Sequence, residues 1–127
     1  MKSIFVLFGG VFILLGILIG AFGAHSLKNH ISVEELQSIK TGIEYQMYHG
    51  LTLILIGFNV NKIKNSEIIC WGLISGTILF SSSIYLLALD HLMAIDFSYL
   101  WPITPIGGTI LIASWAFFVV KVSKIKD

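Results

Sequence analysis

Apolar residues are gathered into four long runs, at residues 3–24, 42–60, 68–89 and 105–122, with more polar stretches between them. A helix needs about 20 apolar residues to cross a hydrocarbon core of about 30 Å. Each run is close to that length, and backbone groups in lipid must bond within their own segment. The pattern therefore predicts an all-α integral membrane protein, a four-helix bundle forming a single transmembrane domain over residues 1–127.

The segment between the first two runs has a helical pattern of its own. Ser32 and Glu35 have the spacing of a capping box, in which each side chain bonds the backbone N–H of the other residue. Apolar residues then recur every three or four positions, with polar and charged residues between them: Val33, Leu36, Ile39 and Ile43, against Glu34, Glu35, Gln37 and Lys40. This predicts a short amphipathic helix in the outer membrane interface, with a solvated linker helix as the alternative.

The lysines predict which way the helices cross. Four crossings put both termini on one side of the membrane. That side carries Lys2, Lys62, Lys64, Lys121, Lys124 and Lys126, and the opposite side carries Lys28 and Lys40. Because cytoplasmic loops are enriched in basic residues, we expect an N-in, C-in topology.

Composition agrees with a membrane location. The chain is 56% hydrophobic and 12% charged, with a mean hydropathy of +0.90, whereas soluble domains are about 25% charged. The first run resembles a signal peptide at its start, but it is longer than the usual apolar region of about 7–15 residues. A net charge of +1 and the absence of arginine give no indication of a nucleic-acid partner.

Polar and glycine-rich motifs interrupt the apolar runs at four places, all toward the predicted outer face. They contribute the candidate site residues: His25, Tyr45, Gln46, His49, Tyr85, Thr104, Gly107 and Gly108. Polar groups at membrane depth need partners inside the bundle, so we expect Gln46, His49 and Tyr85 to face inward and to bond one another or His25. Such a cluster is either a clamp that sets helix register or a titratable, ligand-binding pocket. Thr104 is also placed to cap the fourth helix, with Pro105 in its first turn.

Several kinds of chemistry find little support in the residues. His25, Glu44 and His49 lack the spacing of a zinc site, and a haem held by two histidines has no further support, so no metal or cofactor is expected. The sequence contains no nucleophile elbow, phosphate-binding loop or paired catalytic carboxylates, so we expect no enzymatic activity. No acidic residue lies near the middle of a predicted helix, which disfavours a proton-coupled transporter.

Small residues recur at helix-packing spacing. Gly16 and Gly20 are four apart in the first run, as are Gly72 and Gly76 in the third. Such pairs let two helix backbones approach closely. They predict packing within the monomer, with a homodimer face as the alternative.

Taken together, the motifs resemble those of a known family. They are GAFGAH at 20–25, YQxxH at 45–49, FSxSxY at 80–85 and TPIGG at 104–108. In this order and spacing they are similar to domain-of-unknown-function family 423, the bacterial relatives of transmembrane protein 256. The resemblance covers nearly the whole chain and implies a small four-helix protein of the bacterial plasma membrane. It implies no established activity and no catalytic residues.

Three functional hypotheses follow. The first is a structural or accessory protein that supports membrane integrity or partner proteins. The second is a binding module for a lipid, quinone or other amphiphile in an outer-leaflet pocket. The third, less favoured, is a small oligomeric transporter or channel. The expected partners are membrane lipids and a second copy of the chain or another membrane protein.

Overall fold

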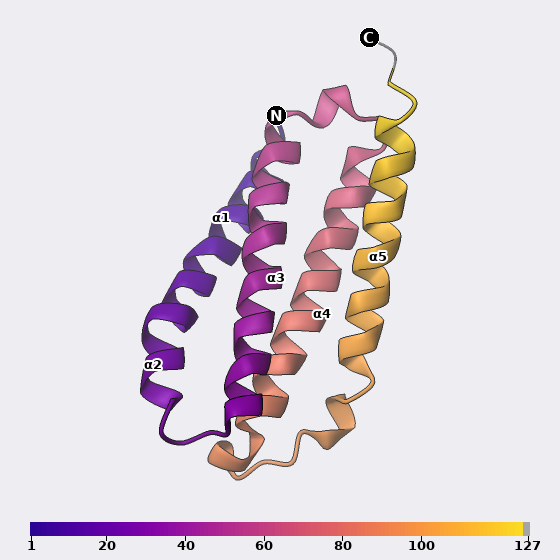
Figure 1. Cartoon of the computed structure of the whole chain (residues 1–127). Coiled ribbons are helices and arrows are strands. Elements are labelled where there is room, and N and C mark those ends of the chain that lie inside the picture. The colour runs from indigo at the N-terminus through magenta and orange to yellow at the C-terminus, as the bar shows by residue number, and fades with distance from the viewer. Residues whose placement is uncertain (126–127) are drawn as a thin grey trace.

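The computed structural model describes residues 1–125 and, at Ala24, the backbone alone. This part of the chain is all-helical (Figure 1). Its helices are α1 (Ser3–Leu18), α2 (Ala24–Leu27), α3 (Val33–Phe58), α4 (Ser66–Met93) and α5 (Ile103–Val122). A π-helical turn, η1 (Ile19–Gly23), joins α1 to α2, and the 3-10 turns η2 (Val60–Lys62) and η3 (Ser98–Leu100) lie in the later connections.

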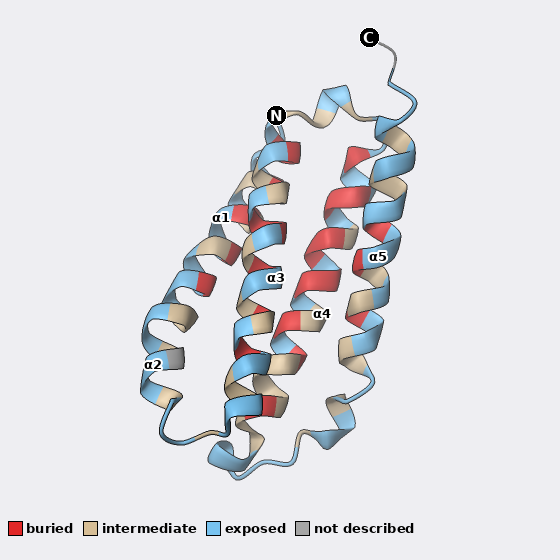
Figure 2. Cartoon of the chain, viewed as in Figure 1, coloured by how far each residue is buried: buried red, intermediate tan, exposed pale blue. Residues whose placement is uncertain are grey.

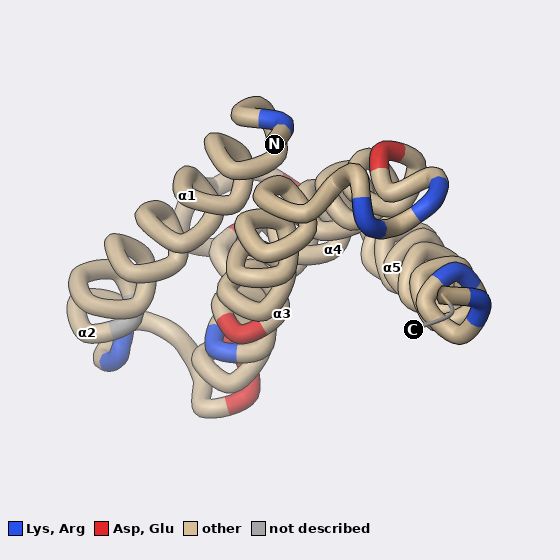
Figure 3. The backbone as a smooth tube through the Cα atoms, turned by 90° about the horizontal axis from the view of Figure 1, so that it is seen from above, with Lys and Arg blue, Asp and Glu red and all other residues tan. Residues whose placement is uncertain are grey.

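The four long helices stand side by side in chain order. α1 packs along α3, α3 along α4, and α4 along α5, and each runs antiparallel to the one before it (Figure 1). Seen along the helix axes, they form a bent row with α1 and α5 at its two ends (Figure 3). Both chain ends therefore lie at the same end of the molecule, as an even number of antiparallel helices requires.

α3 begins with the predicted capping box. The Ser32 hydroxyl accepts from the Glu35 N–H at 3.1 Å, and the Glu35 carboxylate accepts from the Ser32 N–H at 2.7 Å. The helix then continues without a break for 26 residues. The separate short helix and the second membrane helix starting at residue 42 are thus one element, because no proline or turn signal interrupts the chain between them.

The other boundaries extend slightly beyond the apolar runs. α4 begins at Ser66, after Asn65 in the left-handed conformation, and ends before Ala94 in the same conformation. α5 begins at Ile103, and no side chain caps it. The prediction that Thr104 caps this helix is wrong, because the helix already includes Thr104 and the hydroxyl bonds Ser83 of α4 instead, at 2.6 Å.

Among the described residues, three segments are long and apolar enough to cross a membrane: Ser3–Leu27, Ser66–Met93 and Ser98–Val122. α3 is of similar length but is less apolar, with charged and polar residues throughout its first half. The outward faces of the helices are exposed and rich in large apolar residues, whereas the buried positions face neighbouring helices (Figure 2). This is the distribution expected when lipid, and not water, surrounds the helices.

The hydrophobic core lies in the half of the molecule nearer the termini and draws on all four long helices. Its buried members are Phe5, Phe12, Leu53, Ile56, Ile69, Cys70, Leu73, Ile74 and Leu111. The Phe5 ring meets Trp71 edge-on at 5.7 Å and so connects α1 to α4. At the same end Lys2 and Glu67 form an ion pair at 2.7 Å, half exposed and therefore of small energetic weight.

Glycines bring the helix backbones together. A Cβ on Gly9 of α1 would lie 2.5 Å from the carbonyl oxygen of Gly50 on α3. A Cβ on Gly107 of α5 would lie 2.5 Å from the backbone nitrogen of Phe80 on α4. Gly72 and Gly76 likewise face α5, so this pair packs within the chain.

Gly107 and Gly108 provide a matched test of this packing. Gly107→Ala is expected to lower the free energy of unfolding by about 1–3 kcal/mol, since its new methyl group meets α4 backbone that cannot move aside. Gly108→Ala is expected to be neutral or slightly stabilising, because its Cβ would meet only the Phe80 ring, at 3.7 Å. Unfolding in mixed micelles with increasing sodium dodecyl sulfate measures both. Equal stability of the two variants would contradict the close crossing.

Candidate functional site

Gln46, near the middle of α3, joins three helices. Its side chain is buried, and its Nε2 donates to the carbonyl oxygen of Phe12 on α1 at 2.8 Å. Its Oε1 accepts from the Tyr85 hydroxyl of α4 at 2.9 Å. The amide therefore uses one donor and one acceptor to hold α1 and α4 to opposite sides of α3.

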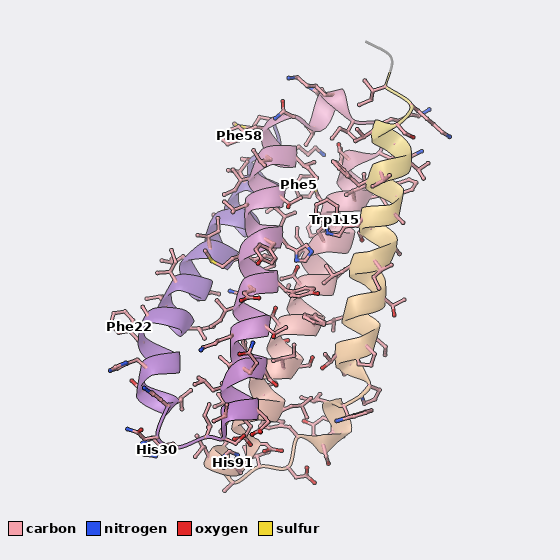
Figure 4. The ribbon with its side chains drawn as sticks, viewed as in Figure 1. Phe5, Phe22, His30, Phe58, His91 and Trp115 are labelled. Carbon is pink, nitrogen blue, oxygen red and sulfur yellow. The ribbon has the colours of Figure 1, made fainter. Side chains whose placement is uncertain are left out.

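His49, one turn further along α3, joins this helix to α5. Its Nδ1 lies 2.5 Å from the carbonyl oxygen of Tyr45, and its Nε2 lies 3.0 Å from Nε1 of Trp115. A carbonyl only accepts and an indole N–H only donates, so Nδ1 carries the proton and Nε2 is bare. The geometry thus holds the imidazole in one neutral tautomer. Trp115 points from α5 toward α3 (Figure 4).

Two further contacts tie α4 to its neighbours. The Ser81 hydroxyl donates to the carbonyl oxygen of Gly42 on α3 at 2.8 Å, and the Tyr85 ring fills the space where a Gly42 side chain would be. Ser83 and Thr104 share a hydrogen bond at 2.6 Å between α4 and α5. Together with Gln46, these contacts form a polar clamp within the apolar helix row.

His25 does not join this clamp. It lies on α2 with an exposed side chain, beyond the π-helical turn, where α1 and α2 diverge from α3 (Figure 1). The expectation that it bonds Gln46, His49 or Tyr85 is therefore wrong. The sequence suggested that His25 lies near the clamp residues because His25 follows the first apolar run. In the structure, the divergence of α1 and α2 from α3 separates His25 from the clamp.

Tyr45, His49 and Gly108 line a groove between α3 and α5 that also reaches Phe80 of α4, whereas Gly107 packs against the α4 backbone and Thr104 lines a different cavity. The groove has a volume of about 780 Å³. Its lining is Tyr45, Tyr48, His49, Phe80, Gly108, Leu111, Ile112, Trp115, Ala116 and Val119. Gln46 and Tyr85 do not line this groove. This groove runs along the middle of the helices, whereas a second cavity lies at the end where the sequence predicted a pocket.

Trp115 is among the groove residues that the sequence prediction missed, and it is the one that bonds a candidate side chain. Tryptophans of membrane helices favour the two interfaces, as Trp71 and Trp101 near helix ends illustrate. Trp115 instead lies well inside α5. This unusual position for a tryptophan was the one feature of the sequence that could have identified it as a site residue. The apolar composition of α5 gave no indication that the indole has a histidine partner.

A second cavity, of about 580 Å³, lies at the end far from the termini. Its lining includes Glu34, Glu35, Asp90 and Trp101. His91 lies beside it, with Nδ1 3.5 Å from the Glu35 carboxylate and Nε2 3.4 Å from the backbone carbonyl oxygen of His30; Figure 4 labels both histidines at this end of the molecule. Within residues 1–125, no group of three or more His, Cys, Asp and Glu side chains is arranged to hold a metal ion.

The clamp predicts opposite effects for two buried polar residues. Gln46→Leu is expected to lower the free energy of unfolding by about 1 kcal/mol, because two interhelical hydrogen bonds are lost at about 0.6 kcal/mol each. Thr77 is buried on α4, and its hydroxyl has no partner among the described residues. Thr77→Val is therefore expected to leave stability unchanged or to raise it by up to about 1 kcal/mol. The same detergent titration measures the free energy of unfolding of both variants. If only Thr77→Val were destabilised, Gln46 would not be a clamp residue and the Thr77 hydroxyl would have a partner.

Comparison with known proteins agrees with the membrane character of the helices. Residues 19–108 match the family described as "Protein of unknown function (DUF423)". The chain is 36% identical over 125 residues to the UPF0382 membrane protein YwdK of Bacillus subtilis, covering 96% of this chain and 98% of YwdK. It is 40% identical over 113 residues to the UPF0382 inner membrane protein YgdD of Escherichia coli, covering 85% of this chain and 80% of YgdD.

A UPF0382 membrane protein of Staphylococcus saprophyticus is 37% identical over 124 residues, which cover 97% of this chain and 99% of that protein. No solved structure matches the chain. The family match includes η1, α3, α4 and the first turns of α5, and therefore most of the clamp. With its apolar helices and these relatives, the chain belongs to the DUF423 family, and it is a multi-pass bacterial membrane protein.

Proposed function

We propose that this protein is a non-enzymatic structural or accessory component of the bacterial plasma membrane. It acts as one domain that crosses the bilayer four times, with both termini in the cytoplasm. The observation that carries the proposal is the polar clamp. The buried polar side chains of α3 and α4 at mid-depth bond mainly to other helices of the same chain, which makes the row a self-contained rigid unit.

The position of α3 supports the fourth crossing. α3 packs along α1 on one side and along α4 on the other, and both of these helices are apolar enough to span. Its polar residues Gln46 and His49 are buried against those neighbours and α5, not directed at lipid. A helix of 26 residues in this place has the length to cross with them.

The charge distribution supports the N-in, C-in orientation. Lysines gather at the end of the molecule that carries the two termini (Figure 3). They are Lys2, Lys62, Lys64, Lys121 and Lys124, while Lys126 lies outside the described residues. Lys28 and Lys40 lie toward the opposite end, together with Glu34, Glu35 and Asp90. We place the first turns of α3, which contain Glu34, Glu35 and Lys40, at the outer interface.

The serines that a catalytic hypothesis would use are already engaged. Ser81 donates to Gly42, Ser82 to the backbone of Ile78 one turn earlier, and Ser83 bonds Thr104.

α1 and α5, at the ends of the row, present large apolar surfaces, including Leu14 at 57% and Val120 at 47% exposure. These surfaces are suited to lipids and to the helices of a membrane-protein partner or a second copy.

Cysteine labelling tests the topology. In a Cys70→Ala background, Lys28→Cys and Lys62→Cys place one thiol on each side of α3. A membrane-impermeant maleimide added to intact cells is expected to label Lys28→Cys, and to label Lys62→Cys only after permeabilisation. Equal labelling of both in intact cells would mean that α3 does not cross. Reversed labelling would mean that the orientation is wrong.

Photo-cross-linking in native membranes tests the accessory role. A photoreactive residue at Leu14 or Val120 is expected to form a discrete protein adduct, and the same residue at the fully buried Leu53 serves as the matched control. Adducts to lipid alone at both exposed positions would contradict a protein partner. Turnover of a substrate by the purified, reconstituted protein would overturn the non-enzymatic role.

A further inference from the structure

The groove between α3 and α5 has features that helix packing alone does not require. It follows α5 from Gly108 to Val119, a length of about 16 Å at about 1.5 Å per residue. None of its ten lining side chains carries a formal charge, apart from the capacity of His49 to ionise. Its volume is within the range of about 300–1,000 Å³ that is usual for small-molecule sites.

Two phenol groups at this groove lack partners within the described part of the chain. The hydroxyls of Tyr45 and Tyr48 make no hydrogen bond there, although both residues lie near the middle of α3. Their side chains are 39% and 58% exposed. An unbonded hydroxyl that faces an apolar medium carries a free-energy cost. A ligand with hydrogen-bond acceptors would remove this cost.

The groove also offers aromatic faces for a flat ring. The ring centroids of Tyr45 and Phe80 lie 4.6 Å apart, with an interplanar angle of 35°. The His49 ring lies 6.0 Å from the Tyr45 ring, and the Trp115 ring lies 6.2 Å from the His49 ring. The hydrogen bond from Trp115 to His49 keeps this wall in place. Offset aromatic contacts of this kind stabilise a bound ring beyond the effect of area burial alone.

We propose that the α3–α5 groove binds the head group of an isoprenoid quinone, which enters sideways from the bilayer. A quinone ring is flat and uncharged, carries two carbonyl acceptors and bears a long apolar tail, so it matches the aromatic wall, the uncharged lining and the two phenol donors. A phospholipid head group is charged or zwitterionic and belongs at the interface. An acyl chain alone fits the apolar lining but leaves both phenols unbonded.

Fluorescence in lipid nanodiscs tests this binding with decylubiquinone as the probe. A Trp71→Phe, Trp101→Phe background leaves Trp115 as the reporter. Decylubiquinone is expected to quench it saturably, whereas decylbenzene, which has the same tail on a flat six-membered ring but no oxygen atoms, is expected to compete poorly. Non-saturable quenching, or equal competition by decylbenzene, would overturn the proposal.

Variants locate the site. Tyr45→Phe with Tyr48→Phe is expected to weaken binding about tenfold or more, since a tenfold change corresponds to about 1.4 kcal/mol. Tyr99→Phe, outside the groove, is the matched control. Gly108→Leu is expected to abolish binding by filling the groove, while Gly10→Leu, where nothing lies within 4 Å, leaves it unchanged. Circular dichroism and the detergent titration verify that each variant folds. Unchanged affinity in folded Gly108→Leu would show that the quinone does not occupy this groove.

Discussion

The structure depends on one constraint: a polar side chain in hydrocarbon must find its partner inside the protein. α3 carries Gln46 and His49 into the middle of the helix row, and each needs a donor or acceptor there. Phe12 and Tyr85 satisfy Gln46, and Trp115 satisfies His49. These partners lie on α1, α4 and α5, so hydrogen bonds from the polar helix α3 reach all three of the other long helices.

Close backbone approach makes these bonds available. α1 meets α3 at Gly9 and Gly50, and α4 meets α5 at Gly76 and Gly107. Side chains at those positions would hold the helices apart and lengthen every bond of the clamp. Hydrophobic burial contributes little to association within lipid, because the tails are as apolar as the side chains. Packing at glycines and interhelical hydrogen bonds therefore account for the specific order of the helices.

The two sides of α3 differ in consequence. On one face, the Gln46 side chain bonds Phe12 of α1 and Tyr85 of α4. On the α5 side, Tyr45 and Tyr48 border a groove, and the bond between His49 and Trp115 crosses it at one level. One helix thus combines a rigid structural face with a face open to the bilayer. This division is compatible with an accessory protein that also holds a small membrane-dissolved molecule.

Much of this architecture follows from local patterns in the sequence. The apolar runs determined the number and approximate positions of the long helices, because helix length and hydropathy are properties of a single segment. The capping box determined the start of α3, because its bonds join residues three apart. The motif at Gln46 correctly indicated an inward-facing partner for Tyr85, since buried amides and phenols in lipid require one.

Only the tertiary structure decided which helices those partners come from. The divergence of α1 and α2 from α3 removed His25 from the site, and the crossing of α5 brought Trp115 to His49, 66 positions away in the chain. Periodicity assigns a face to a residue but not the rotation of one helix against another. That rotation arises from glycine contacts and hydrogen bonds between distant segments, so the groove, unlike the helices that border it, was not visible in the sequence.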